Sequence, residues 1–252
     1  MTNESDAIFE ETIRINTYEC DTHQNWKPAA FFQHMTETAH LHSIKLGVGF
    51  EKLFANDLTW VHSRMKIQFY RFPQVDEIVT IRTWPKAIQQ KLFYVRDFEV
   101  LDTNGQRLAA STSLWLIINT KTRRLVPPRL LSFTLPILED RYGLDETLEK
   151  LDLEQVGEER LREQASYSTL DIVGHVNNSR YVEWICDAFP MEMYDQHQLD
   201  WIQVNYDHEI LPGEEVSVLV NSLAPNDGLW SVQGHNRSND TRAFEAKLKW
   251  KS

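Results

Sequence analysis

The residues best suited to chemistry lie in a short polar run, from Asp171 to Asn178, just before a predicted helix. Gly174 permits a tight turn in this run, and the turn directs the side chains of Asp171 and His175 towards the start of the helix. The first turn of a helix has unpaired backbone N–H groups and the positive end of the helix dipole, so it favours an anion. The run therefore indicates a site that could stabilise an oxyanion.

The helix after this run is predicted from apolar residues that recur at three- and four-residue spacing from Tyr181 to Phe189. Asn177 or Asn178 is the expected N-cap. Taken singly, the polar residues before the helix could equally be capping groups and a hydrogen-bonded loop histidine. The functional interpretation depends on the run as a whole.

As a whole, the run from Asp171 to Tyr181 resembles the Asp-x-x-x-His-Val-Asn-Asn-x-x-Tyr signature of hot-dog-fold thioesterases. It is most similar to the second half of the fatty acyl-ACP thioesterases of bacteria and plant plastids. In that family the strand after the second helix carries a catalytic glutamate. Glu209, at the end of a strand predicted from Trp201 onward, matches it. The resemblance thus implies a catalytic set of Asp171, His175 and Glu209.

Two positions depart from the family pattern. Ile210 stands where many members have a cysteine after the glutamate, so a Cys-His-Asn mechanism is excluded at this site. Val173 takes the place of an Asn that many acyl-ACP thioesterases keep two residues before the histidine. Cys186, on the predicted helix, is expected to be a small core residue.

Thioester hydrolysis needs a base that activates water and donors that stabilise the tetrahedral oxyanion. We expect Glu209 to activate the water and Asp171 to orient His175. We expect His175 and the N–H groups at the helix start to polarise the thioester carbonyl. Asn177 and Asn178 are expected to contact the substrate.

The elements that must position this site follow the order strand, long helix, four strands. Residues 12–20 alternate apolar and polar side chains, as a half-buried strand does. A long helix is predicted from Pro28, which suits a first helical turn, to Gly47, and strands are predicted within residues 60–120. This order fits a sheet that wraps around one helix.

The second half of the chain repeats this order. When the two halves are aligned, Asp21 corresponds to Asp171, Asn25 to His175, and Phe72-Pro73 to Leu211-Pro212. Only the second half carries the histidine. Together with the resemblance, the repeat predicts an α+β tandem hot-dog fold, with a curved antiparallel sheet around a long helix in each half. Residues 1–130 are expected to form a substrate-binding domain, residues 131–163 a linker, and residues 164–252 the catalytic domain.

An apolar stripe in the first half could line a cavity for the acyl chain. Trp60 and Met65 are candidate lining residues, together with Ile67 and Phe69. Such a stripe is also typical of an ordinary core.

Charge is unevenly distributed. The formal net charge of −11 argues against a nucleic-acid partner, yet residues 1–130 carry sixteen Lys and Arg against fourteen Asp and Glu. An acidic carrier would therefore dock on the N-terminal half, at an exposed cluster of basic residues: Lys121, Arg123, Arg124 and Arg129. Scattered solubilising charge is the alternative interpretation.

The composition and motifs of the chain also indicate which kinds of site and partner it lacks. The two cysteines lie far apart and the histidines do not cluster, so neither a disulfide framework nor a metal site is expected. No cofactor is expected, because no Gly-rich phosphate loop follows a strand. The chain has no apolar run of membrane-spanning length and no signal peptide, which predicts a cytoplasmic protein without a membrane partner.

We therefore predict hydrolysis of the thioester of fatty acyl-acyl carrier protein, which releases free fatty acid and ends chain elongation. The expected partner is acyl carrier protein with a phosphopantetheine-linked acyl chain. Two alternatives stay open: an acyl-CoA thioesterase, and a catalytically silent module that binds an acyl group or its carrier. The oligomeric state is open too, with a homodimer as the candidate assembly.

Overall fold

The computed structural model describes residues 6–153 and 157–251, which form two compact units divided after Leu148. The first unit contains these elements: β1 (Phe9–Arg14), α1 (Pro28–Lys45), α2 (Phe50–Phe54), β2 (Leu58–Phe69), β3 (Ile78–Gln89), β4 (Phe93–Leu101) and β5 (Arg107–Asn119). Its strands form an antiparallel sheet in the order β1-β3-β4-β5-β2.

The second unit contains its own five strands and two helices: β6 (Glu158–Gln164), α3 (Asn178–Asp187), α4 (Met191–Gln196), β7 (Gln198–Tyr206), β8 (Glu215–Ala224), β9 (Leu229–Asn236) and β10 (Thr241–Lys251). Its antiparallel sheet has the order β6-β8-β9-β10-β7. When each unit's strands are numbered from its own start, both sheets have the order 1-3-4-5-2. The two units thus share one topology.

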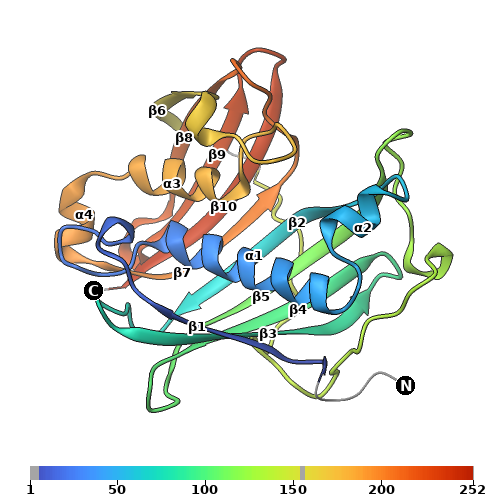
Figure 1. The fold of residues 1–252 in the computed structure, drawn as a ribbon. Helices are drawn as coiled ribbons and strands as arrows, with labels where there is room; N and C mark the ends of the chain where they lie inside the picture. The colour runs from blue at the N-terminus through green and yellow to red at the C-terminus, as the bar shows by residue number, and fades with distance from the viewer. Residues whose placement is uncertain (1–5, 154–156, 252) are drawn as a thin grey trace. The chain divides into compact units, whose positions relative to one another are not determined.

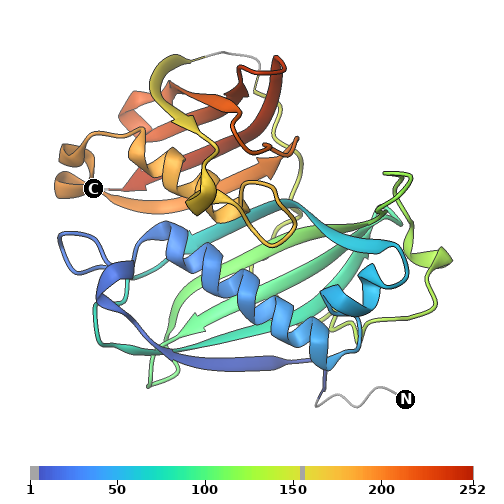
Figure 2. The same ribbon diagram turned by 45° about the horizontal axis from the view of Figure 1, so that its top comes forward.

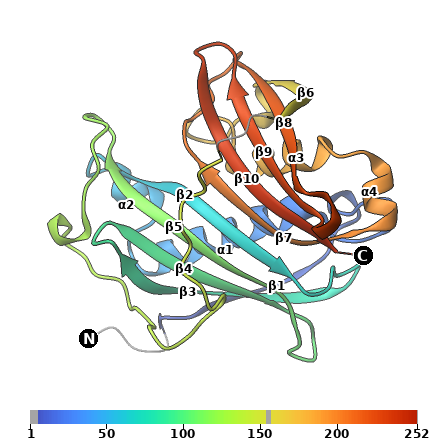
Figure 3. The ribbon, with the colours of Figure 1, turned by 180° about the vertical axis from the view of Figure 1, so that it is seen from behind.

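In each unit one helix lies against one face of the sheet (Figures 1 and 2), and the view from behind shows the opposite face of the strands (Figure 3). Phe31 on α1 meets the ring of Phe69 on β2, with the ring centroids 5.1 Å apart. Tyr181 on α3 stacks on Phe244 of β10 at the same centroid distance. Full burial of a large apolar side chain contributes about 1.5–3 kcal/mol, so these contacts fix each helix on its sheet. Among helices of the described residues, none is long and apolar enough to cross a membrane.

The long helix of the first unit ends as its sequence predicts. Leu46 is the C-cap, and Gly47 adopts a left-handed φ of 72° that a side chain would disfavour. The first strand differs from our prediction of residues 12–20. β1 ends at Arg14 because Asn16 and Glu19 form a capping box that closes a short 3-10 turn, with Glu19 Oε2 accepting the Asn16 N–H at 3.2 Å.

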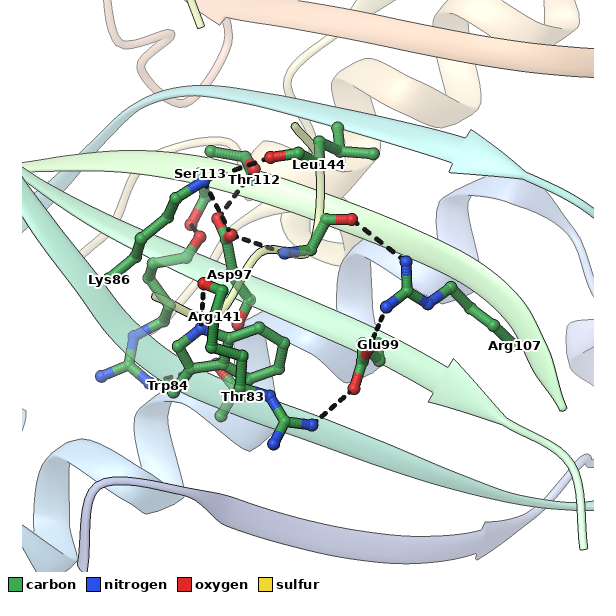
Figure 4. Close-up of polar contacts among 12 residues, drawn as sticks. Thr83, Trp84, Lys86, Asp97, Glu99, Arg107, Thr112, Ser113, Arg141 and Leu144 are labelled. Carbon is green, nitrogen blue, oxygen red and sulfur yellow. Dashed lines mark hydrogen bonds and ion pairs between the residues drawn. The ribbon is translucent and has the colours of Figure 1, made fainter. Parts of the chain in front are cut away.

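The predicted linker, residues 131–163, belongs in large part to the two units. Residues 158–163 belong to β6, where they pair with β8, and residues 131–148 belong to the first unit. Figure 4 shows the segment that carries Arg141 and Leu144 lying against the first sheet. The Gly143 N–H donates to Asp97 Oδ2 at 2.7 Å, and Arg141 pairs with Glu99 at 2.8 Å. Together with Thr112, Lys86 and Arg107 of the sheet, these bonds satisfy the buried carboxylates of Asp97 and Glu99.

A buried imidazole connects α1 with the first sheet. His42 Nδ1 accepts a hydrogen bond from Arg96 at 2.9 Å, so the ring proton resides on Nε2, which donates to the Asp6 carbonyl at 2.9 Å. Burial, and after it the nearby charge of Arg96, lowers the pKa of His42 to about 4. The folded protein therefore holds this histidine neutral.

We expect acid to destabilise the fold through His42. The unfolded chain takes up this proton near pH 6.5 and the folded chain only near pH 4, so stability falls as the pH drops through this window. This group alone should lower the free energy of unfolding by about 2 kcal/mol at pH 5 relative to pH 7. Urea unfolding at pH 7 and pH 5 measures it. His42→Gln should reduce the loss, whereas replacing the exposed His23 should not; equal losses in all three proteins would exclude His42 as the source.

Candidate active site

The predicted turn before α3 is formed by backbone hydrogen bonds. Asp171 N–H donates to the His175 carbonyl at 2.8 Å, and Gly174 N–H donates to the Asp171 carbonyl at 3.1 Å. Gly174 has a φ of 83°, the left-handed conformation that the turn requires. The turn therefore holds His175 immediately before the helix.

The Asp171 carboxylate stabilises this turn by accepting hydrogen bonds from its backbone. Its Oδ1 accepts the N–H groups of Val173 at 2.9 Å and of His175 at 3.3 Å. The bonds formed by Asp171 in the described residues thus hold the backbone of His175 and do not reach its imidazole ring. Asp171 can orient His175 only through the main chain.

Glu209 meets the imidazole. It lies three residues beyond the end of β7, and its Oε2 is 3.2 Å from Nδ1 of His175. The side chains are 40% exposed for Glu209 and 27% exposed for His175, so water and substrate can reach both. Because Nδ1 faces the carboxylate, Nε2 is the ring nitrogen left for a substrate.

The helix start is capped by Asn177. Its Oδ1 accepts the Ser179 N–H at 2.9 Å and the Ser179 hydroxyl at 2.7 Å. Asn178 is the first helical residue, and its N–H has no acceptor within the helix because it belongs to the first turn. Of the two predicted substrate contacts, Asn177 has a capping role, and Asn178 offers a backbone donor beside His175.

The residues that depart from the family pattern leave the His175–Glu209 contact intact. Val173 is 45% exposed on the turn, and no side chain from this position is needed between the two residues. Ile210 is fully buried. Burial raises the pKa of Cys186 to about 12, so its thiol is not a nucleophile at neutral pH.

The corresponding turn in the first unit has the same backbone geometry and different chemistry. Asp21 Oδ1 accepts the N–H groups of His23 at 2.8 Å and Asn25 at 2.9 Å, as Asp171 does in the second unit. Asn25 takes the place of His175. The helix then begins with Pro28, which has no N–H to offer an oxyanion. This turn therefore has no imidazole at the position of His175 and no backbone donor at the first residue of the helix.

The glutamate has no counterpart in the first unit either, and here the predicted alignment of Phe72-Pro73 with Leu211-Pro212 was wrong by two residues. The Glu77 carbonyl accepts the Ile15 N–H, and the Glu214 carbonyl accepts the Ala165 N–H, both at 2.9 Å. When the two units are aligned on these equivalent bonds, Phe72 corresponds to Glu209 and Pro73 corresponds to Ile210. The sequence alignment was misled because a proline occurs near this bend in both halves.

The predicted acyl-lining residues lie in the first unit. Met65 is 1% exposed, in the interior with Ile67 and Phe69. Trp60 is partly buried, and its Nε1 donates to the Val48 carbonyl at 3.0 Å. A bulge between His62 and Arg64 puts Trp60 and Met65 on the same face of β2. An acyl chain could reach Met65 only if neighbouring side chains moved.

The predicted docking residues are exposed on the segment after β5: Lys121, Arg123, Arg124 and Arg129. Lys121 pairs with Asp57 at 2.8 Å. Leu125 and Leu130, which are 50% and 69% exposed, lie among them in the sequence. The segment thus combines basic and apolar side chains.

Comparison with known proteins matches both units to one family. The family model described as the acyl-ACP thioesterase N-terminal domain matches residues 6–128, and the C-terminal domain model matches residues 154–252. A chloroplastic palmitoyl-acyl carrier protein thioesterase of Cuphea hookeriana is 28% identical over 243 residues, which cover 90% of this chain and 57% of the plant protein. The chain spans about half to two thirds of the length of the curated plant relatives it matches.

Solved structures confirm the predicted fold. The crystal structure of an acyl-ACP thioesterase from Bacteroides thetaiotaomicron has a TM-score of 0.85 and 24% identity, covering 99% of this chain and 100% of that one. A 12:0-ACP thioesterase from Umbellularia californica has a TM-score of 0.74 and 22% identity, covering 97% of both chains. The chain therefore has the α+β double hot-dog fold.

Proposed function

Because the chain belongs to the acyl-ACP thioesterase family, we propose that it hydrolyses the thioester bond of a fatty acyl group carried by acyl carrier protein. The products are the free fatty acid and the carrier thiol, so the reaction ends chain elongation. One observation above all supports this proposal: His175 Nδ1 lies 3.2 Å from Glu209 Oε2 in front of a helix start. This arrangement suits attack by water on a carbonyl carbon.

In the proposed reaction Glu209 is the general base. Its carboxylate, which contacts His175 through Oε2, takes a proton from a water molecule. The water oxygen then forms a bond to the thioester carbonyl carbon, and the carbonyl electron pair moves onto oxygen. The result is a tetrahedral oxyanion.

His175 and the start of α3 would stabilise that oxyanion. We assign the imidazole a proton on each nitrogen during this step, so that Nδ1–H donates to Glu209 and Nε2–H donates to the oxyanion. The N–H of Asn178 supplies a second donor at the positive end of the helix dipole. When the oxyanion collapses, the carbon–sulfur bond breaks and the proton held by Glu209 passes to the departing thiolate.

The two units would have different roles in the reaction, as expected from the sequence. The second unit carries the reacting residues, and the first supplies an apolar interior that includes Trp60 and Met65 for the acyl chain. Asn25 and Phe72, which stand in the places of His175 and Glu209, support this division because they cannot form an ion pair. The homodimer and the cytoplasmic location expected from the sequence stay predictions.

The carrier would dock on the basic segment after β5. The carrier is expected to be acidic, and opposite charge accelerates encounter and orients the partner. Arg124 and Arg129 are exposed, and Leu125 and Leu130 add apolar area beside them. Mixed basic and apolar surface of this kind suits a partner that must bind and then leave.

Charge reversal in this segment should weaken capture of the acyl carrier. Arg124→Glu with Arg129→Glu should raise KM for acyl-ACP about three- to tenfold at low ionic strength and flatten its salt dependence, with kcat unchanged. Lys27→Glu with Lys91→Glu makes the same change in charge on the same unit and serves as the control. An unaltered salt response of KM in the first variant would remove these residues from the docking surface.

The proposed function is tested with matched acyl-ACP and acyl-CoA thioesters of several chain lengths, by measuring release of free thiol. We expect a higher kcat/KM for acyl-ACP than for acyl-CoA of the same acyl chain. The reverse preference would assign the activity to acyl-CoA. Absence of thiol release from every thioester would identify a binding module.

A further inference from the structure

The bend that carries Glu209 lies beyond the paired part of its strand. The pairing between β7 and β10 ends at Tyr206, so hydrogen bonds outside the sheet ladder must hold the residues that follow. We propose that His208 is a positioning residue, whose imidazole binds this bend to β10 and so holds the Glu209 carboxylate in front of His175. This inference rests on the proposed role of Glu209 as the base.

The His208 side chain makes a direct bond to β10. Its Nδ1 lies 2.8 Å from the Arg242 carbonyl oxygen, which can only accept, so Nδ1 carries a proton and donates. The main chain adds to this contact, because the N–H groups of Asp207 and His208 donate to the Ala243 carbonyl at 2.9 and 3.1 Å. The residue before Glu209 is therefore held by both its side chain and its backbone.

The residue that His208 binds is itself fixed in position. Arg242 Nε donates to Asp207 Oδ2 at 2.9 Å, and another nitrogen of Arg242 pairs with Glu245 at 2.5 Å. Glu245 is fully buried, so it anchors the arginine to the interior of the second unit. The imidazole of His208 thus connects the bend to a part of β10 that ion pairs hold in place.

The chain after Glu209 is held to the segment that carries His175. The Ile210 carbonyl accepts the Val176 N–H at 3.0 Å, and the Ile210 side chain is fully buried. Glu209 therefore lies between two anchored residues, with its Oε2 3.2 Å from Nδ1 of His175. Loss of the His208 bond would let the carboxylate drift from the imidazole of His175, and small displacements of reacting groups are costly.

The first unit supplies an internal comparison, because its bend has the same backbone bonds. The Leu108 carbonyl accepts the N–H groups of Tyr70 at 2.9 Å and of Arg71 at 3.1 Å, so Arg71 corresponds to His208. The side chain at this position differs in its partner. The Arg71 guanidinium pairs with the Glu77 carboxylate through two bonds, at 2.8 and 2.9 Å.

The arginine that precedes the accepting carbonyl also has a different partner in each unit. In the first unit Arg107 pairs with Glu99 on β4 (Figure 4). Tyr70, at the position of Asp207, offers it no carboxylate. Both units thus keep the backbone bonds of the bend, whereas the side-chain bonds of Asp207 and His208 occur in the unit that carries the proposed base.

Two substitutions of His208 test the inference. His208→Leu removes the donor and should lower kcat for acyl-ACP about three- to tenfold with KM within about twofold, because one hydrogen bond is lost and no substrate contact is changed. His208→Asn keeps an N–H donor near the position of Nδ1 and should restore kcat to within about twofold of the wild type. His235→Leu is the control, since His235 is a partly exposed histidine of the same unit that pairs with Asp240; it should keep the wild-type kcat.

The Glu209→Gln background separates positioning from a structural role. In that background His208→Leu should cause no further loss of kcat, because the base that His208 positions is already gone. A full additional loss would give His208 a merely structural role and overturn the inference. A wild-type kcat in His208→Leu, or a loss that His208→Asn does not repair, would overturn it as well.

A second measurement does not depend on turnover. Long-range ¹H–¹⁵N spectra of protein labelled at histidine show which ring nitrogens carry a proton, and His175→Ala and His208→Leu identify the signals of the two residues. We expect a proton on Nδ1 of His208, set by its bond to the Arg242 carbonyl. We also expect the Nδ1 signal of His175 to shift in His208→Leu and to stay unchanged in His235→Leu.

These spectra distinguish failure of the inference from failure of the proposed function. A His208 ring with its proton on Nε2 alone, or an unshifted His175 signal in His208→Leu, overturns the inference. A wild-type protein that hydrolyses no thioester would instead refute the proposed function, and the spectra would still decide whether His208 positions Glu209.

Discussion

Glu209→Gln should reduce turnover of acyl-ACP by about two to four powers of ten, the range expected for loss of a general base. Glutamine keeps the shape of the side chain and can still meet His175, but it cannot take a proton from water. The affinity for acyl-ACP and the unfolding midpoint should therefore stay close to those of the wild type. Steady-state kinetics with acyl-ACP measures the loss.

The control for this variant is Glu183→Gln. Glu183 lies on α3, its side chain is 31% exposed, and its replacement removes the same charge from the same unit. We expect it to turn over acyl-ACP at the wild-type rate. Equal rates for both variants and the wild type would refute the assignment of Glu209 as the base.

His175→Ala should cost a factor comparable to that of Glu209→Gln, because it removes the donor to the oxyanion and the partner of the carboxylate. The double variant should lose little more than the more severe single variant, since the two residues perform one task. Asn25→Ala alters the equivalent turn of the first unit and should leave kcat unchanged. If the loss in the double variant equalled the product of the two single-variant losses, the residues would act independently.

Cys186 provides an additional control for the mechanism. Its raised pKa disfavours the thiolate, so Cys186→Ser should retain turnover. A folded but inactive Cys186→Ser protein would contradict a reaction by direct attack of water.

Local signals predicted the helices well. The long helix was expected from Pro28 to Gly47 and runs from Pro28 to Lys45, because a proline and a glycine mark its ends in the sequence. The helix after His175 was expected to begin near Asn177, which is its N-cap. The first strand ends earlier than predicted because the alternation continued through the capping box, where the amide of Asn16 and the carboxylate of Glu19 bond to the backbone.

The site was predicted only in part, because its decisive contact joins residues far apart in the chain. His175 and Glu209 were both named, but spacing gives no distance between the turn before α3 and the bend after β7. We also expected Asp171 to orient His175; its carboxylate binds the backbone of the turn and not the imidazole.

The linker shows another limit of composition. Residues 131–163 were expected only to join the two domains, and the structure places Gly143 against the first sheet, where an added Cβ would lie 2.7 Å from the Ser111 carbonyl oxygen. Only a glycine permits so close an approach. Charge counts cannot reveal such a contact, since it depends on the backbone and on one missing side chain.

The central claim is that this chain hydrolyses acyl-ACP with Glu209 as the base, and one measurement tests it most directly. Intact carrier protein is followed by mass spectrometry during a single turnover with excess enzyme, for the wild type and for Glu209→Gln. The account predicts that the wild type converts acyl carrier into the free-thiol carrier, whereas Glu209→Gln binds the acyl carrier with unchanged affinity and leaves it acylated. Acyl carrier left intact by the wild type, or converted equally fast by Glu209→Gln, would contradict it.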